Sequence, residues 1–248
     1  TYLRNRDFHS RLGMWQQTVK LRPENARAHM NLAIELAGAG QLQEALGYFE
    51  EAVRLRPSYP EGHANLGLAL DKLGRPAEAL PHYRQALEIW PNYVPGHVML
   101  GDFYFRQNRP AEALVSYQKA VELEPGDAEA HSNMGAALTR LGRREEAKAR
   151  FEEALRLRPN FAEAHSNLGA VLSELGQKQE ALAHHKEAVR LEPQSAHFRT
   201  NLGHLLEELG AIEEAVAQYR EAVKFDPKNE QVHANLTRAE RKLVDSRK

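Results

Sequence analysis

Seven prolines divide the chain into segments of equal length. Each lies 34 residues after the previous one, as Pro57 follows Pro23 and Pro227 follows Pro193. The others are Pro91, Pro125 and Pro159. A motif repeated at a constant step of this size indicates a repeat array, in which each repeat packs only against its neighbours. The sequence therefore predicts a stack of similar elements instead of one globular core.

Each repeat has the pattern of two helices. In residues 128–141 apolar side chains recur at spacings of three and four, which is one face of a helix. A glycine follows this helix in five repeats and Asn108 takes its place in another; both residues tolerate the left-handed backbone that ends a helix. The glycines are Gly40, Gly74, Gly142, Gly176 and Gly210. A second helix runs from this turn to the loop proline, and Pro81 inside one of them predicts a bend or a late helix start.

Small residues recur where the two helices of a repeat should cross. The second helices carry an alanine at this point, and the first helices carry a glycine that allows close backbone approach. The alanines are Ala45, Ala79, Ala113, Ala147, Ala181 and Ala215, and the glycines are Gly67, Gly101, Gly135, Gly169 and Gly203. A larger residue there would overpack the crossing, at a cost of roughly 1–3 kcal/mol.

The residues Leu66, Gly67, Ala79, Tyr83 and Pro91, together with Ala86, form a pattern that resembles the tetratricopeptide repeat (TPR) signature. The resemblance implies an all-α fold, a right-handed TPR superhelix (an α-solenoid) of antiparallel helix pairs. Six repeats fit: 26–59, 60–93, 94–127, 128–161, 162–195 and 196–229. Residues 1–25 are expected to form an N-terminal half-repeat and residues 230–248 a C-terminal capping helix.

Composition argues against several functions. The 33 Lys and Arg balance 34 Asp and Glu, so no basic field attracts nucleic acid. No window approaches the roughly 18–20 apolar residues of a membrane-spanning helix, so direct membrane insertion by this segment is not expected. Cysteine is absent, and no GxSxG, HExxH, P-loop or dinucleotide motif occurs. We therefore expect no enzymatic activity within the chain and no cofactor.

Histidine is the remaining candidate for chemistry, since six of the twelve copies share one repeat position. They are His29, His63, His97, His131, His165 and His233. Metal ligands must converge within about 2.0–2.1 Å of the ion, whereas equivalent residues of stacked repeats should lie roughly a helix diameter, about 10 Å, apart. We predict that these histidines pack between repeats and bind no metal. Buried neutral histidines would make the fold less stable as pH falls through about 6.

Asparagine recurs one residue before the Leu-Gly step of the first helices. The set comprises Asn31, Asn65, Asn133, Asn167, Asn201 and Asn235. It resembles the asparagine ladder of O-linked N-acetylglucosamine transferases, which implies a concave groove that binds the backbone of an extended peptide. A side-chain amide can match a peptide N–H and C=O whatever the peptide's sequence. The alternative is a row of solvated polar residues without a ligand.

Met99 interrupts the asparagine row in the third repeat. Val98 lies beside it and Phe105 two turns further on, at positions that the TPR resemblance turns toward the groove, and Asp102 completes the predicted peptide-binding set. With Met30, Ile34 and Leu68 upstream, these residues predict an apolar anchor site for a bound peptide. The alternative is that residues 1–22, with Tyr2, Phe8, Leu12, Met14 and Trp15, cover this surface.

The carboxylate clamp of chaperone-binding TPR domains is not expected. The resemblance places its Lys and Arg at groove positions that here hold other residues. These are Met30, Ala64, Val98, Ser132, Ser166 and Thr200. Binding of chaperone C-termini is therefore not expected.

We expect a peptide-binding scaffold that recruits or positions substrates for a larger protein. Residues 1–33 resemble the junction between membrane region and TPR tail in membrane O-mannosyltransferase-like proteins, and residues 1–25 hold five Lys and Arg against two acids. Attachment to an upstream membrane region would make the location periplasmic or lumenal; otherwise it would be cytoplasmic. The alternatives are a cytoplasmic scaffold that self-associates end to end and a regulatory arm of a glycosyltransferase. The partner's identity, its direction, the segment before Thr1 and the oligomeric state stay open.

Overall fold

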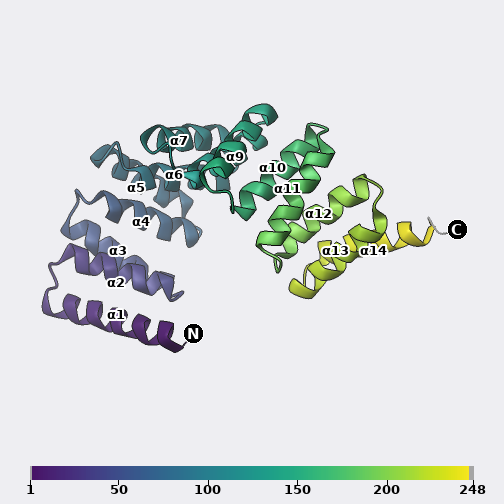
Figure 1. Cartoon of the computed structure of the whole chain (residues 1–248). Helices are drawn as coiled ribbons and strands as arrows, with labels where there is room; N and C mark the ends of the chain where they lie inside the picture. Colours follow the sequence, from purple (N-terminus) through teal and green to yellow (C-terminus); the bar gives the residue numbers. More distant parts are fainter. Residues whose placement is uncertain (1, 246–248) are drawn as a thin grey trace. The chain divides into compact units, whose positions relative to one another are not determined.

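The computed structural model describes residues 2–245, with side chains from residue 11 onward, and this range contains fourteen α-helices and no strand (Figure 1). The first helices of the repeats, called A helices here, are α2 (Ala26–Gly38), α4 (Pro60–Lys72), α6 (Val94–Arg106), α8 (Ala128–Arg140), α10 (Ala162–Glu174) and α12 (Ala196–Glu208). The second, or B, helices are α3 (Leu42–Leu55), α5 (Pro76–Ile89), α7 (Pro110–Leu123), α9 (Arg144–Leu157), α11 (Lys178–Leu191) and α13 (Ile212–Phe225). Helices α1 (Tyr2–Leu21) and α14 (Glu230–Asp245) flank them.

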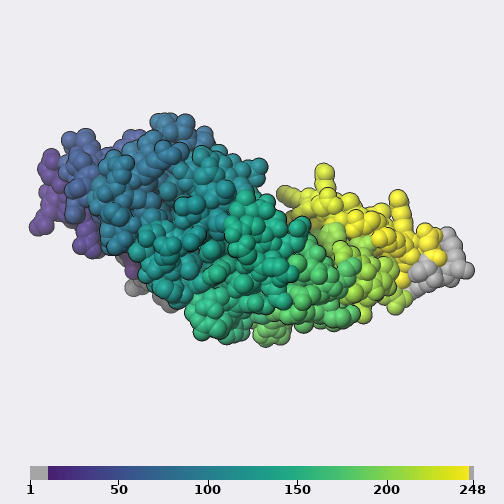
Figure 2. All heavy atoms as spheres, turned by 90° about the horizontal axis from the view of Figure 1, so that it is seen from above, coloured from purple at the N-terminus to yellow at the C-terminus, as the bar shows by residue number. Residues whose placement is uncertain are grey.

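The chain forms two compact bodies. The N-terminal body ends at Glu124 and contains α1–α7, and the C-terminal body starts at Pro125 and contains α8–α14. In each body every A helix packs most extensively against the B helix that follows it. Figure 2 shows side chains closing the spaces between neighbouring helices of the N-terminal body. The fold is therefore an all-α array of helix pairs, as predicted, and the division between Glu124 and Pro125 falls at a loop proline, between the third and fourth repeats.

The turns within the pairs have the predicted left-handed residue. The five turn glycines have φ between 73° and 81°, and Asn108 has φ 55°. The next residue bonds back across the helix end, as when the Gln41 N–H donates to the Leu36 carbonyl at 2.9 Å. Because glycine carries no Cβ, this conformation costs it little, and the turn fixes where the B helix begins.

An aromatic ring fills the crossing beneath the glycine of each A helix from α4 to α12. A Cβ added to Gly203 would lie 2.6 Å from the Tyr219 ring, and one added to Gly135 would lie 2.8 Å from the Phe151 ring. The predicted crossing alanines are all 0% exposed. The missing Cβ and the small alanine thus let a large ring become part of the core.

The repeated histidines join the loops to the A helices. In all six, Nε2 lies 2.8–3.1 Å from the carbonyl oxygen of the loop proline six residues earlier. At the equivalent position of α12, Arg199 Nε donates to the Pro193 carbonyl at 2.9 Å. The packing prediction is confirmed for the buried His29, His63 and His131, whereas His233 is exposed. The proline hydrogen bond was not foreseen.

Pro81 does not delay its helix. Helix α5 begins at Pro76 and runs through Pro81 to Ile89, so the expectation of a late start was wrong. Proline at the sixth helical position removes one intrahelical bond, the one that its N–H would make to Ala77. Burial of Ala79, Tyr83 and Ala86 on the same helix supplies the packing that keeps the segment helical.

The flanking helices take the places of half-repeats. Helix α1 packs against α2, and α14 packs against α13, where the buried Ala239 lies in one cluster with Val216 and Tyr219. Trp15 of α1 is half-buried at the position of the crossing aromatic, and Met14 is 49% exposed. The side chains of Tyr2 and Phe8, expected to help cover the apolar surface, lie outside the described side chains.

Gly203→Ala should destabilise the protein by about 1–3 kcal/mol, because the new methyl group overlaps the Tyr219 ring. Gly47→Ala is the matched control: it lies exposed in α3 with no atom within 4 Å of an added Cβ, so it should stabilise by about 0.5–1 kcal/mol through helix propensity. Urea unfolding of both variants measures the difference. A neutral Gly203→Ala would contradict the crossing geometry.

Candidate peptide-binding surface

The A helices of the N-terminal body carry an apolar patch, made of Ile34, Leu68, Val98, Met99 and Phe105. Ile34 is 45% exposed and the other four are half-buried. Val98 and Phe105 are seven residues apart on α6, two helical turns, so they share one face. The patch contains every apolar residue predicted for this surface except Met30, which is only 3% exposed and belongs to the core.

Met99 is half-buried, and the buried part of its side chain packs against the preceding repeat. It packs against a cluster of Ala64, Ala86 and Tyr93 in the second repeat. Since Met99 itself belongs to the third repeat, this contact joins the two repeats. The methionine that interrupts the asparagine row therefore fills a gap between repeats and also contributes surface to the apolar patch.

Asp102 lies on the same face of α6 as Val98 and Phe105, and its carboxylate is engaged within the protein. The Tyr117 hydroxyl donates to it at 2.7 Å. Arg106 of α6 forms an ion pair with Asp71 of the neighbouring A helix α4 at 2.6 Å, and the Asp71 side chain is only 6% exposed. The acidic groups around the patch thus hold helices together, which leaves the apolar side chains as its main exposed chemistry.

The asparagine row in the N-terminal body consists of Asn31 and Asn65, both half-buried. Asn65 Nδ2 donates to the Glu61 carbonyl of its own helix at 2.8 Å. One of its two N–H groups is therefore used locally, while its carbonyl oxygen remains an acceptor suited to a peptide N–H.

The asparagine row in the C-terminal body changes along its length. Asn133 and Asn167 are half-buried. Asn201 Nδ2 donates to Ser166 Oγ at 3.1 Å and so links α12 to α10. Asn235 is 0% exposed. It contacts His204 Nε2 at 3.2 Å and accepts from Gln231 at 3.1 Å. A peptide cannot reach a fully buried amide, so we remove Asn235 from the candidate contacts.

Glu207 anchors the last helix of the C-terminal body. Its side chain is 6% exposed and accepts hydrogen bonds from Arg238, Lys242 and Tyr219 at 2.7–3.1 Å. Burial raises the carboxyl pKa, but these hydrogen bonds outweigh burial and lower the pKa to about 2. The carboxylate therefore stays charged and joins α12 to α13 and α14.

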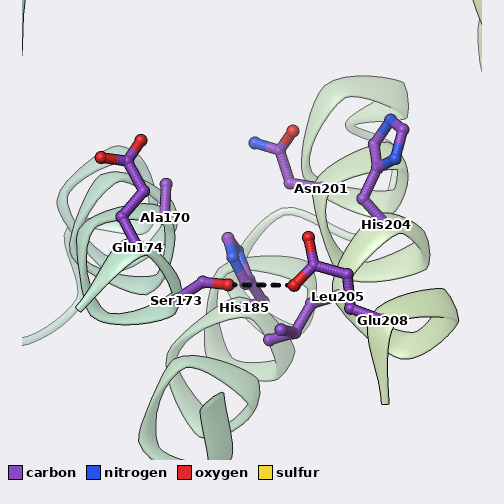
Figure 3. Close-up of a pocket in the computed structure, with 8 residues that line it drawn as sticks. All are labelled: Ala170, Ser173, Glu174, His185, Asn201, His204, Leu205 and Glu208. Atoms are coloured by element: carbon purple, nitrogen blue, oxygen red, sulfur yellow. Dashed lines mark hydrogen bonds between the residues drawn. The ribbon is translucent and has the colours of Figure 1, made fainter. Parts of the chain in front are cut away.

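A cavity of about 220 Å³ lies between α10 and α12, with His185 of α11 between them (Figure 3). It is lined by Ala170, Ser173, Glu174, His185, Asn201, His204, Leu205 and Glu208. Burial, together with the nearby His184 and His197, lowers the pKa of His185 to about 4. Sequence reasoning missed this cavity, although one signal was present: His185 stands where the other repeats have Phe or Tyr.

No group of three or more His, Cys, Asp or Glu side chains is placed to hold a metal ion among the described residues. None of the described helices combines the length and the apolar character that crossing a bilayer requires.

Comparison with known proteins decides the family. Tetratricopeptide repeat models match residues 1–60, 31–94, 126–194 and 172–239, and a TPR repeat model matches residues 101–142. The chain belongs to the tetratricopeptide repeat family. No curated protein matches this TPR chain.

Solved TPR structures share its fold. The Cut9–Hcn1 hetero-tetramer of the APC/C has a TM-score of 0.81 and 18% identity over 93% of this chain, which spans only 46% of that chain. PilW, a type IV pilus biogenesis factor, has a TM-score of 0.78 and 22% identity over 85% of this chain and 98% of its own. YrrB, described as a TPR protein with an unusual peptide-binding site, has a TM-score of 0.58 and 25% identity, covering 72% and 92%.

Glu207→Gln should destabilise the TPR fold by about 1–3 kcal/mol, the range for losing hydrogen bonds to a charged group. The folded pKa is lower than the unfolded value, so the stabilisation is complete above about pH 4.5 and is lost as pH falls toward 2. Denaturant unfolding at pH 7 measures the loss, with the exposed Glu230→Gln as control. Equal stability of the two variants would contradict the anchoring role.

The TPR chain should also lose stability in mild acid through His185. Its folded pKa is depressed, so the unfolded state binds the proton first, and stability falls as pH drops from about 6.5 toward 4. The full effect is about 3 kcal/mol, at about 1.4 kcal/mol per pKa unit. Burial also lowers the pKa of His82, His184 and His204. His185→Tyr should therefore reduce, without abolishing, the fall in melting temperature between pH 7.5 and 5. An unchanged pH profile would count against a buried neutral His185.

Proposed function

We propose that this TPR chain binds extended peptide segments on the A-helix faces of its two bodies. The observation that carries the proposal is the apolar patch: five apolar side chains, exposed or half-exposed, lie on three successive A helices. Exposed apolar surface of this kind commonly marks a contact site. Apolar residues of the peptide would bury their side chains against Phe105, Val98 and Met99.

The asparagines supply the second component of the proposed site. Asn65 in the N-terminal body, and Asn133 and Asn167 in the C-terminal body, offer half-buried amides beside the exposed face. An amide contacts peptide backbone groups and does not depend on the peptide's side chains. Binding would therefore be sequence-tolerant along the asparagine rows and selective for apolar residues at the patch. The peptide-binding site named in the description of YrrB supports this use of the fold.

We further propose that the domain recruits or positions protein substrates for a larger, membrane-attached protein. The support is the N-terminal stretch, which resembles the junction of O-mannosyltransferase-like proteins, and its excess of basic residues. The coding sequence upstream of Thr1 tests this. Hydrophobic spans there would support the proposal, and a start codon there would favour a free-standing scaffold.

End-to-end self-association, the alternative, is disfavoured by the two flanking helices. In an end-to-end stack, α14 of one copy would act as the A helix and α1 of the next copy as the B helix of a joint repeat. The two helices would then have to cross as the helices of a repeat do. Arg11 of α1 occupies the position of the crossing alanines, and Thr237 of α14 occupies that of the glycine. Each larger residue would overpack the crossing, by roughly 1–3 kcal/mol.

The alternative that the chain is a regulatory arm of a glycosyltransferase depends only on the resemblance of its asparagines to the asparagine ladder. Asn201 and Asn235 bind residues of their own chain, so the ladder is less continuous than the sequence suggests. We therefore retain peptide binding without assigning the chain to that enzyme class.

Phe105→Ala should weaken peptide binding by about 1–3 kcal/mol, because it truncates the apolar anchor. An array of short random peptides identifies binders, and calorimetry gives their Kd values. Phe103→Ala is the matched control: Phe103 lies on the same helix but is 3% exposed, so its loss should lower the melting temperature far more. If Phe105→Ala melts like Phe103→Ala and no array peptide binds, Phe105 is core and the proposal fails.

Paired Asn133→Ala and Asn167→Ala changes should weaken unrelated peptides to a similar degree, since they remove backbone contacts. Calorimetry with three array peptides of different sequence tests this. Loss confined to one peptide would indicate side-chain recognition instead.

A further inference from the structure

We propose that the cavity between α10 and α12, called the His185 pocket here, binds the basic side chain of an arginine or lysine in a bound peptide. The inference rests on the proposed function, because it assumes that extended peptides follow the A-helix face. It adds that the C-terminal body would select peptides with a basic residue, independently of the apolar patch in the N-terminal body.

The pocket exists because the ring at the crossing is smaller here than elsewhere. At the same repeat position Tyr117 and Tyr219 extend a hydroxyl to the A-helix carboxylates of Asp102 and Glu207, at 2.7 Å in both cases. His185 lacks that reach. The remaining space is about 220 Å³, roughly seven times the volume share of one water molecule in the liquid, which suits a single long side chain.

The walls combine apolar and acidic groups. Ala170 and Leu205 offer apolar surface to the methylene stem of a lysine or arginine. Glu174 and Glu208 place carboxylates on the two facing helices, and Asn201 adds an amide. No Lys or Arg is among the lining residues. The lining is therefore suited to a cation and unfavourable to an acidic side chain.

Both carboxylates already have partners at the edge of the pocket. Glu174 pairs with Arg144, and Glu208 pairs with Lys178 at 3.0 Å and accepts from Ser173 at 3.5 Å. These pairs are about half exposed to solvent, where ion pairs contribute little. Each carboxylate has two oxygens and several lone pairs, so it can accept a further N–H from a bound cation.

The histidines in the wall do not oppose a cation. His185 is 3% exposed and its buried Nδ1 has no hydrogen-bond partner in the described structure. Figure 3 shows its ring pointing into the space between α10 and α12. Burial lowers the pKa of both His185 and His204, so both rings are neutral at pH 7. A neutral imidazole carries no positive charge and offers one acceptor nitrogen.

NMR titration of the full chain tests the proposal with Nα-acetyl-arginine amide as the probe. We expect saturable shifts of the His185 ring and the Asn201 side-chain amide, with a Kd of roughly millimolar magnitude, as befits one side chain. Nα-acetyl-citrulline amide is the matched probe because it has nearly the same shape without the charge. It should bind at least about tenfold more weakly, the effect of losing charge-assisted hydrogen bonds. Equal binding of the two probes overturns the proposal.

His185→Tyr fills the pocket with the residue that three other repeats use at this position, so the fold should be retained. It should abolish saturable binding of the arginine probe, and retained binding with unchanged affinity overturns the proposal. If this variant fails to fold, the Glu174→Gln and Glu208→Gln double variant decides. It should weaken the arginine probe at least about tenfold and leave the citrulline probe unchanged.

The peptides identified on the random array separate this inference from the proposed function. Binding of those peptides that depends on Phe105, with no binding of the arginine probe, removes the His185 pocket and leaves the proposed function. Binding of the arginine probe without any Phe105-dependent peptide removes the apolar site of the proposed function and leaves a pocket for basic side chains.

Discussion

The contact between an A-helix glycine and a B-helix aromatic ring determines how each repeat is built. The ring needs the space that a Cβ would occupy: a Cβ added to Gly203 would lie only 2.6 Å from the Tyr219 ring. With the glycine and the crossing alanine in place, two short helices bury a large ring and form a stable pair. Their remaining apolar face then packs on the next repeat, so that the core is continuous within each body while no repeat has a core of its own.

The same crossing also determines what the A-helix face can offer. The hydroxyls of Tyr117 and Tyr219 donate to Asp102 and Glu207, whereas the buried Tyr83 hydroxyl has no hydrogen-bond partner among the described residues. A histidine stops short and leaves the His185 pocket. Core composition and surface chemistry are therefore coupled, because one ring position sets both the packing of the pair and the partners available on the exposed face.

The sequence predicted the fold well because its signals are local. Turn glycines, the loop prolines and apolar spacing each act within one repeat, so helix order and the left-handed turn at Asn108 followed from a few adjacent residues. The late helix start expected at Pro81 was the exception, since the packing of α5 outweighed its missing hydrogen bond. The surface was harder to predict, because residues equivalent by repeat are not equivalent in burial. Met30 and Asn235 are buried, whereas Val98 and Asn167, at the equivalent positions of other repeats, are half-buried.

The histidine-proline hydrogen bond fixes where protons reside in two pairs of imidazoles. A carbonyl only accepts, so His63 and His165 carry a proton on Nε2, and in the uncharged form of each ring Nδ1 is then a lone pair. Their Nδ1 atoms lie 3.2 Å and 2.8 Å from Nδ1 of His82 and His184. With the first ring of each pair uncharged, the second ring is the Nδ1–H tautomer, the form that is ordinarily less common for histidine in water. A backbone oxygen in a loop thus selects the tautomer of a side chain on another helix, through one intervening ring.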